Sequence, residues 1–193
     1  MFIVPSILDV AFLAVNLRIN SSGSPSGAVK GEITPFYSCL TVEGIKHVKR
    51  LAGGVKLIYL IRDPMARALS SLRMNIERAP LRSQIELVCE NYFQKRGDYR
   101  KNISSWESIF DREKILYLPF GWISHKPEDL MRDVEAFLNL PRFDGYEDLS
   151  GAVNPTKEVV VGNRATEILV EQTRDQYDFL QDRFGVEFVS QLG

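Results

Sequence analysis

The residues with the clearest chemical potential stand where an apolar run meets a helix-start signal. The run Lys56–Ile61 is typical of a strand buried on both faces of a parallel sheet. Asp63 can cap a helix, and Pro64 suits the first helical position. Arg62 therefore falls at a strand-to-helix junction, where free backbone N–H groups favour an anion. Ser70 follows eight positions later, and a guanidinium with a hydroxyl could grip a phosphate. Alternatively, the arginine is a solvated residue at an ordinary junction.

The helix that must carry the serine has two distinct faces. An apolar stripe at helical spacing predicts its core side: Met65, Leu69, Leu72 and Ile76. Ser70 shares a different face with Arg67 and Met74. The hydroxyl is therefore expected to point into the space beside the helix and not into the core.

Strands alternate with helices along the rest of the chain, which predicts an α/β fold with a parallel sheet. A short strand is expected to run into Glu32, a helix to start after Thr41, and a second buried strand to cover 114–118. Further helices are predicted over 81–95, 99–110, 126–138 and 165–184. The apolar segment Met1–Val15 is too short for a membrane span and lacks the charged start of a signal peptide, so a buried N-terminal helix is expected.

Composition limits the classes of function. With 193 residues and 45% hydrophobic content, the chain is expected to form a single domain over 1–193, with an atypical segment at 1–27. A net charge of −1 gives no field that attracts nucleic acid or an acidic membrane. Cys39 and Cys89 are far apart, which predicts reduced thiols and a cytoplasmic protein. Both histidines are isolated, so no metal site is expected.

Four segments in order form one pattern: Gly31–Ser38, with Gly-Glu-x-Thr-Pro-x-Tyr; Lys56–Ser70, with the Arg-Asp-Pro junction; Gly97–Phe110, with Gly-x-Tyr; and Lys114–Leu140, ending in Phe-Leu-x-Leu. This pattern resembles the sulfotransferases that use 3′-phosphoadenosine 5′-phosphosulfate (PAPS), in particular bacterial relatives of the heparan sulfate sulfotransferases. The resemblance covers roughly Ala28 to Gly185. It implies a three-layer fold like that of P-loop NTPases, with a parallel sheet flanked by helices.

The resemblance also implies roles for single residues. Arg62 and Ser70 would hold the 3′-phosphate of PAPS, and Glu32 would be the general base that takes a proton from a hydroxyl or amine acceptor. Asn154 and Lys157 fall where the family's late loop closes on the nucleotide phosphates. Transfer of the sulfuryl group would be in line, and no metal is implied. From the residues alone, the glutamate could instead be paired with a nearby lysine, and the late lysine could be solvated.

The chain departs from the family at its beginning. The family starts with a Gly-rich phosphate loop whose lysine stabilises the leaving phosphate, whereas residues 1–29 contain no lysine and no such loop. We therefore expect an N-terminally truncated sulfotransferase fold. The exposed sheet edge would be covered by the N-terminal helix or by a second copy, which would make a homo-oligomer. Phe120-Gly121-Trp122 stands where relatives often have Tyr-Glu-Asp, and Trp122 is expected to anchor its loop.

Three explanations for the missing loop stay open. The chain could be a fragment of a longer gene, a natural short form that binds nucleotide without turnover, or a chain that takes its loop from a partner. Two functions therefore stay open as well: a sulfotransferase, or a non-catalytic nucleotide-binding or interaction module on the same fold. The sequence does not specify the acceptor.

Overall fold

A computed structural model describes residues 12–16, 30–52, 54–90, 94–146 and 159–193. Within them lies a four-stranded sheet of order β2-β1-β3-β4. Its strands are β1 (Phe12–Asn16), β2 (Lys30–Ile33), β3 (Lys56–Ile61) and β4 (Ile115–Pro119). β3 and β4 run parallel, while β1 is antiparallel to both of its neighbours.

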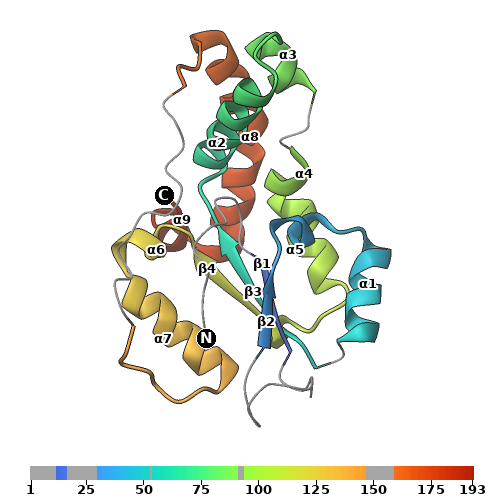
Figure 1. Cartoon of the computed structure of the whole chain (residues 1–193), viewed down its shortest axis with the longest axis vertical. Helices are drawn as coiled ribbons and strands as arrows, with labels where there is room; N and C mark the ends of the chain where they lie inside the picture. The colour runs from blue at the N-terminus through green and yellow to red at the C-terminus, as the bar shows by residue number, and fades with distance from the viewer. Residues whose placement is uncertain (1–11, 17–29, 53, 91–93, 147–158) are drawn as a thin grey trace.

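Helices surround the sheet (Figure 1). The α-helices are α1 (Val42–Leu51), α2 (Pro64–Arg78), α3 (Gln84–Cys89), α4 (Gln94–Gly97), α5 (Tyr99–Glu107), α6 (Trp122–His125), α7 (Pro127–Leu138), α8 (Asn163–Phe184) and α9 (Val186–Val189). The 3₁₀-helices are η1 (Pro35–Cys39) and η2 (Arg112–Lys114). In the part of the chain that the structure describes, no helix is long and apolar enough to cross a bilayer.

The prediction for the start of the chain is wrong where it can be compared. A helix was expected over Met1–Val15, but Phe12–Asn16 form a strand; residues 1–11 lie outside the described ranges. The run of four apolar residues over 12–15 fits both a helix face and a buried strand, so its side-chain spacing does not decide between them. Pairing with β2 and β3 favours the strand, because the backbone groups on both edges of β1 then have hydrogen-bonding partners in a neighbouring strand.

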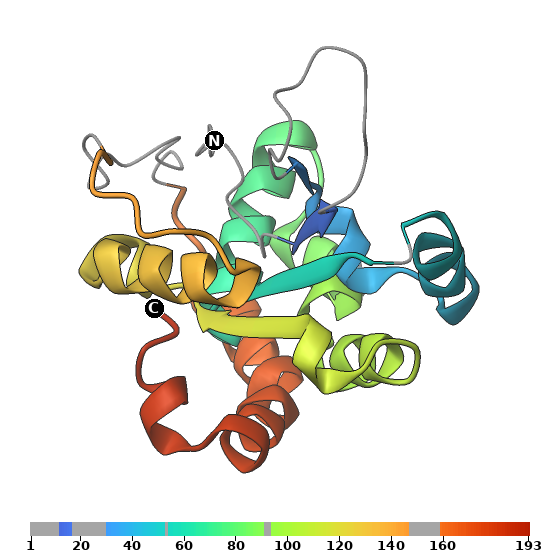
Figure 2. The same ribbon diagram turned by 90° about the horizontal axis from the view of Figure 1, so that it is seen from below.

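The expected α/β layers are confirmed. Helices α1, α5 and α8 pack on one face of β3 and β4, in a cluster of buried residues: Ile45, Val55, Leu57, Tyr59, Ile61, Tyr99, Ile103, Trp106, Phe110, Ile115, Tyr117, Leu180 and Leu192. Helix α7 covers the other face. Its Val134 and Leu138 form a cluster with Ile58 of β3 and Leu118 of β4. Figure 2 shows α7 and α8 on opposite sides of the two parallel strands. The antiparallel β1 is an addition that the alternation of strands and helices does not predict.

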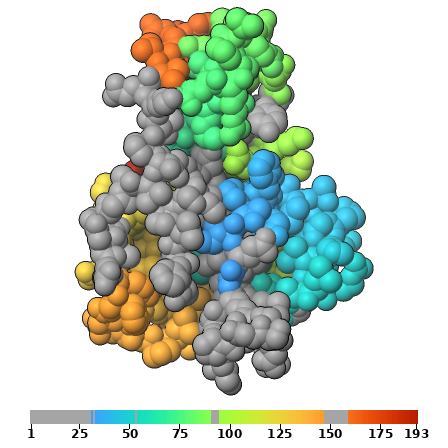
Figure 3. Space-filling view, viewed as in Figure 1, coloured from blue at the N-terminus to red at the C-terminus, as the bar shows by residue number. Residues whose placement is uncertain are grey.

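A second hydrophobic cluster joins α2, α3 and α8. Its buried members are Ala68, Leu72, Leu87, Val88, Ala165 and Leu169, with Met65, Leu69 and Ile76 packed against them. Helices α2 and α3 and the first part of α8 lie beyond the end of the sheet (Figure 1), and their surface forms the top of the molecule in Figure 3. The predicted apolar stripe of α2 is therefore confirmed as its core side.

Local signals explain most element boundaries. Thr41 caps α1 as expected, because its Oγ1 accepts a hydrogen bond from the Gly44 N–H at 3.2 Å. Helix α7 ends at Asn139, which adopts a left-handed conformation with φ of 56°. The single helix expected over 81–95 is instead the short α3, preceded by a capping box of Ser83 and Glu86, and the separate α4.

Candidate functional site

The strand-to-helix junction forms as the sequence predicts. β3 ends at Ile61, Arg62 follows, and α2 begins at Pro64 (Figure 1). Asp63 is the cap residue, and its Oδ1 accepts a hydrogen bond of 2.7 Å from the Ala66 N–H. Arg62 is thus placed at the carboxyl end of a parallel strand and beside a helix N-terminus, where α/β proteins bind ligands and where the dipole favours an anion.

The side chain of Arg62 is half-buried against an aromatic ring. Its guanidinium carbon lies 5.0 Å from the ring centroid of Phe120, which follows β4. The Phe120 N–H donates to the Ile61 carbonyl at 2.8 Å, so the ring is held next to the end of β3. A cation–π contact of this kind engages the flat face of the guanidinium, whereas its N–H donors lie in the plane.

The peptide group between Arg62 and Asp63 is held at both of its polar atoms. The Tyr99 hydroxyl donates to the Arg62 carbonyl at 2.8 Å, and the Asp63 N–H donates to the Leu192 carbonyl at 3.0 Å. Because the peptide is planar, two bonds from opposite ends fix its orientation. They come from α5 and from the segment after α9, two parts of the chain far from the junction in sequence.

Asp63 also ties the junction to α8. The Tyr177 hydroxyl donates to Asp63 Oδ2 at 2.5 Å and accepts a 3.3 Å hydrogen bond from the Met65 N–H. Burial, and then the bond to the carboxylate, raise the pKa of Tyr177 well above its usual value, so the phenol stays protonated. The aspartate therefore works as a structural link and not as a free acid.

Ser70 lies on α2 with 3% of its surface exposed. Its Oγ is buried and has no hydrogen-bond partner among the residues described. Such an atom has lost its contact with water without a replacement, which is unfavourable. The expectation that this hydroxyl points into the space beside the helix is therefore wrong: packing covers Oγ, and a phosphate could reach it only if that packing moved.

Sequence reasoning missed Arg67, the other notable polar residue of α2. It was placed with Ser70 and Met74 on a face other than the apolar stripe, and it is only 2% exposed. Its guanidinium lies against Gly97, where an added Cβ would come well inside the 3.0 Å that real Cβ contacts keep. The glycine of the Gly-x-Tyr segment therefore makes room for a buried arginine, a pairing that no local signal in the sequence announces.

Glu32 is not brought next to Arg62. It lies in β2, and the register places it in one row with Ala14 and Leu57 across three strands. From strand spacings of about 4.8 Å and a rise of about 3.3 Å per residue, the Cα atoms of Glu32 and Arg62 are about 19 Å apart. The two residues could serve one reaction only through an extended ligand. Asn154 and Lys157 lie outside the described residues.

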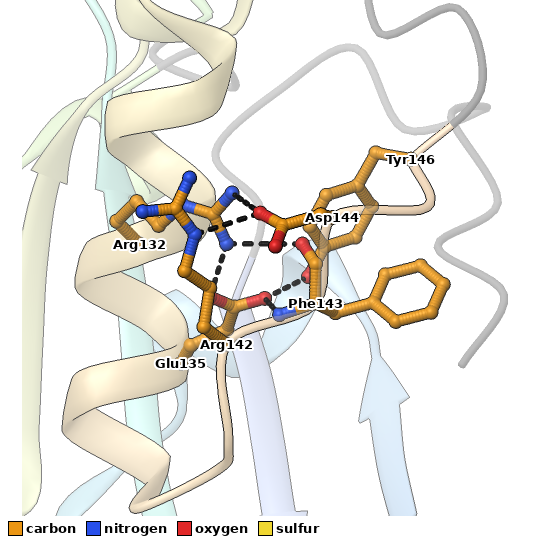
Figure 4. A network of polar contacts seen from close by, with 6 residues as sticks. All are labelled: Arg132, Glu135, Arg142, Phe143, Asp144 and Tyr146. Carbon is orange, nitrogen blue, oxygen red and sulfur yellow. Dashed lines mark hydrogen bonds and ion pairs between the residues drawn. The ribbon is translucent and has the colours of Figure 1, made fainter.

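The chain on either side of 147–158 is held by polar contacts. Glu135 of α7, 4% exposed, accepts hydrogen bonds from the Tyr146 hydroxyl at 2.6 Å and the Phe143 N–H at 3.0 Å, and it pairs with Arg132 at 2.8 Å (Figure 4). The bond from the tyrosine, with that from the arginine, lowers the pKa of Glu135. Figure 4 also shows Arg132 and Arg142 converging on Asp144.

A matching contact lies on the far side of the same stretch. The Gln84 side chain donates to the Val160 carbonyl at 2.9 Å and accepts from the Gly162 N–H at 2.8 Å. The amide of Gln84 is thus donor to one backbone group and acceptor from another. The two hydrogen bonds hold residues 160–162 at the start of α3. Sequence patterns did not indicate either anchor.

A pocket of about 240 Å³ opens between α2, α8 and the α4–α5 connection. It is lined by Pro64, Arg67, Ala68, Gly97, Asp98, Leu169, Gln172, Thr173, Asp175 and Gln176. Neither Arg62 nor Ser70 lines it, so it is separate from the predicted phosphate grip. In the described part of the chain, no group of three or more histidine, cysteine or carboxylate side chains could hold a metal ion.

The chain forms a mixed α/β domain with Arg62 at a strand-to-helix junction, and comparisons with known proteins narrow the class to which this domain belongs. Residues 20–145 match the model of the Sulfotransferase family. That match covers more than half of the sequence, so the chain belongs to the sulfotransferase family.

The fold is similar to the crystal structure of a sulfotransferase from Alicyclobacillus acidocaldarius, with a TM-score of 0.58 and 18% sequence identity. The match covers 77% of this chain and 61% of that chain, so this chain spans about three fifths of the length of its structural relative. At this identity the likeness concerns the fold. No curated protein matches the sequence.

Proposed function

We propose that this protein binds PAPS and transfers its sulfuryl group to a hydroxyl or amine acceptor. The observation that carries the proposal is the junction at Arg62. A half-buried guanidinium stands at the end of a buried strand, and the helix that follows carries the buried, unpartnered hydroxyl of Ser70. In a member of the sulfotransferase family, Arg62 is suited to the 3′-phosphate of the donor, because charge-assisted hydrogen bonds from arginine are strong. Ser70 would join it once the packing over its hydroxyl moves aside.

The reaction needs one proton acceptor and little covalent chemistry from the protein. The acceptor oxygen or nitrogen attacks sulfur, the bond between sulfur and the bridging oxygen breaks, and its electron pair leaves with the 5′-phosphate. We assign the acceptor's proton to the carboxylate of Glu32, and contacts with the nucleotide phosphates to Asn154 and Lys157. The 19 Å estimated between Glu32 and Arg62 fits a donor that extends from its 3′-phosphate toward the sulfuryl group. Catalysis would then rest on positioning and charge stabilisation.

A second function follows from one observation. Residues 1–29 hold no lysine and no Gly-rich phosphate loop. A chain that keeps the 3′-phosphate grip without such a loop would bind the nucleotide without transferring sulfate, unless a second copy or a partner chain supplied a cation to the leaving phosphate. We also propose a cytoplasmic location, where the thiols of Cys39 and Cys89, which form no disulfide with each other, would stay reduced.

Transfer of labelled sulfate from PAPS to a panel of sugars, phenols and amines tests the proposal. We expect transfer to at least one class of acceptor, and a loss of about 100-fold or more in Glu32→Gln, since general-base catalysis contributes about 10²–10⁴-fold. Glu43→Gln in the first turn of α1 is the matched control and is expected to keep full activity. Tight binding of the desulfated nucleotide without any transfer would favour the second function.

A further inference from the structure

The last residues of the chain lie across the ends of both parallel strands. We call residues 191–193 the tail. The Leu192 carbonyl accepts the hydrogen bond from the Asp63 N–H, just after β3. At Gly121, just after β4, an added Cβ would fall well inside 3.0 Å of the Gln191 carbonyl oxygen and 2.9 Å from that of Gly193. The tail backbone thus touches both strand ends at once.

The tail is built into the fold through its side chains. Leu192 is 1% exposed and belongs to the main hydrophobic cluster. Gln191 Oε1 accepts a hydrogen bond from Trp122 Nε1 and another, at 3.3 Å, from Lys126 Nζ. Trp122 is therefore the loop anchor that the sequence led us to expect, and its partner is the tail.

These contacts act on the peptide group that carries Arg62. Its carbonyl is held by Tyr99 and its N–H by Leu192, which sets the direction in which the arginine leaves the strand. The same end of the sheet holds Phe120, on whose ring the guanidinium stacks at 5.0 Å. Without the tail, one of the two fixed ends of this peptide group would be lost.

We propose that the tail positions Arg62 for the 3′-phosphate of the donor, with Leu192 acting through its backbone carbonyl. Gly121 provides the space that the tail needs. The inference rests on the proposed function, and the tail lies beyond the matched range of 20–145. Leu192 and Gly121 are positioning residues, since neither would touch the ligand.

Gly121→Ala is the test variant, because its Cβ collides with backbone atoms of the tail that cannot rotate away. Gly54→Ala is the matched control, because nothing lies within 4 Å of the added Cβ. Gln191→Ala is a second variant that removes the anchor to Trp122 without adding atoms, so it covers the case in which Gly121→Ala does not fold.

Two readouts separate positioning from general stability. Hydrogen exchange at the Asp63 amide reports whether the tail still accepts its bond, and we expect faster exchange in Gly121→Ala and Gln191→Ala. Calorimetry with 3′-phosphoadenosine 5′-phosphate (PAP) and with adenosine 5′-phosphate (AMP) reports the use of the 3′-phosphate. We expect Gly121→Ala to lower the affinity for PAP by about tenfold, the equivalent of about 1.4 kcal/mol. The affinity for AMP should fall by less than about threefold. Gly54→Ala should change neither readout.

The outcomes distinguish this inference from the proposed function. If the unaltered protein binds PAP more tightly than AMP, and Gly121→Ala and Gln191→Ala keep that preference, the tail does not position Arg62. The assignment of Arg62 to the 3′-phosphate would then still hold. If exchange at Asp63 is unchanged in both variants, the tail does not hold the junction. If the unaltered protein binds AMP as tightly as PAP, the 3′-phosphate grip itself is wrong.

Discussion

Replacing Tyr99 by phenylalanine tests how firmly the arginine-bearing peptide is held. Tyr99 is fully buried, and its hydroxyl donates to the Arg62 carbonyl at 2.8 Å. The substitution keeps the ring and its packing, so it creates no large cavity and removes one hydrogen bond. Burial raises the pKa of Tyr99 to about 12, so the hydroxyl is a donor throughout the neutral pH range.

The expected loss of stability follows from the partner that stays behind. A neutral hydrogen bond contributes about 1 kcal/mol net, and a buried acceptor left unsatisfied costs about 1–3 kcal/mol. We therefore expect Tyr99→Phe to lower the free energy of unfolding by about 1–3 kcal/mol. Tyr177→Phe removes a donor to the charged Asp63 carboxylate, and bonds of this kind are roughly twice as strong, so its loss should be the larger of the two.

Urea unfolding followed by circular dichroism measures both variants. With a slope of about 2 kcal/mol/M for a domain of this size, the midpoint of Tyr99→Phe should fall by about 0.5–1.5 M with the slope unchanged. The two losses should not simply add in the double variant, because both hydroxyls hold one junction. A midpoint of Tyr99→Phe within about 0.2 M of the unaltered protein would refute the reasoning.

Two further predictions concern the surroundings of the site. Gly97→Ala forces a Cβ into the guanidinium of Arg67, which is 2% exposed, so thermal unfolding should show a loss of about 1–3 kcal/mol from overpacking; unchanged stability would show that the arginine can move aside. Tyr146→Phe removes the hydrogen bond that most strongly lowers the pKa of Glu135. Because the folded pKa is depressed, this stabilisation is present above the carboxyl's ordinary pKa of about 4.3 and is lost as the pH falls through the lowered value. In urea unfolding at pH 7, the unaltered protein should therefore have a larger free energy of unfolding than Tyr146→Phe. This difference should become smaller in acid. A difference that is the same at all pH values would contradict the assignment of the lowered pKa to the Tyr146 hydrogen bond.

Local signals in the sequence were enough for the core of the site. The strand Lys56–Ile61, the cap at Asp63 and the first helical position at Pro64 are confirmed. Each depends on residues that touch one another along the chain, so propensity and capping rules suffice. The capping box of Ser83 was also readable, and it would have placed the start of α3 correctly.

The features that the sequence did not reveal depend on distant contacts. β1 was expected to be helical because nothing within Phe12–Asn16 shows that two strands will pair with it. Arg67 was placed only on the face of Ser70 and Met74, and its burial was not foreseen because the glycine that accommodates it lies thirty positions away. The tail carries no motif, and its contacts with the ends of β3 and β4 exist only in the folded chain. Glu32, Asn154 and Lys157 stay predictions.

The most direct test of the account is a binding cycle for Arg62 and the 3′-phosphate. Calorimetry compares PAP with AMP, in the unaltered protein and in Arg62→Met, with Arg78→Met at the exposed end of α2 as the control. Since a charge-assisted hydrogen bond contributes about 1.5–3 kcal/mol, Arg62→Met should lower the affinity for PAP by about 10- to 150-fold. The affinity for AMP should change by less than about threefold. Equal losses for the two nucleotides, or unchanged affinity for PAP, would contradict the assignment of Arg62 to the 3′-phosphate.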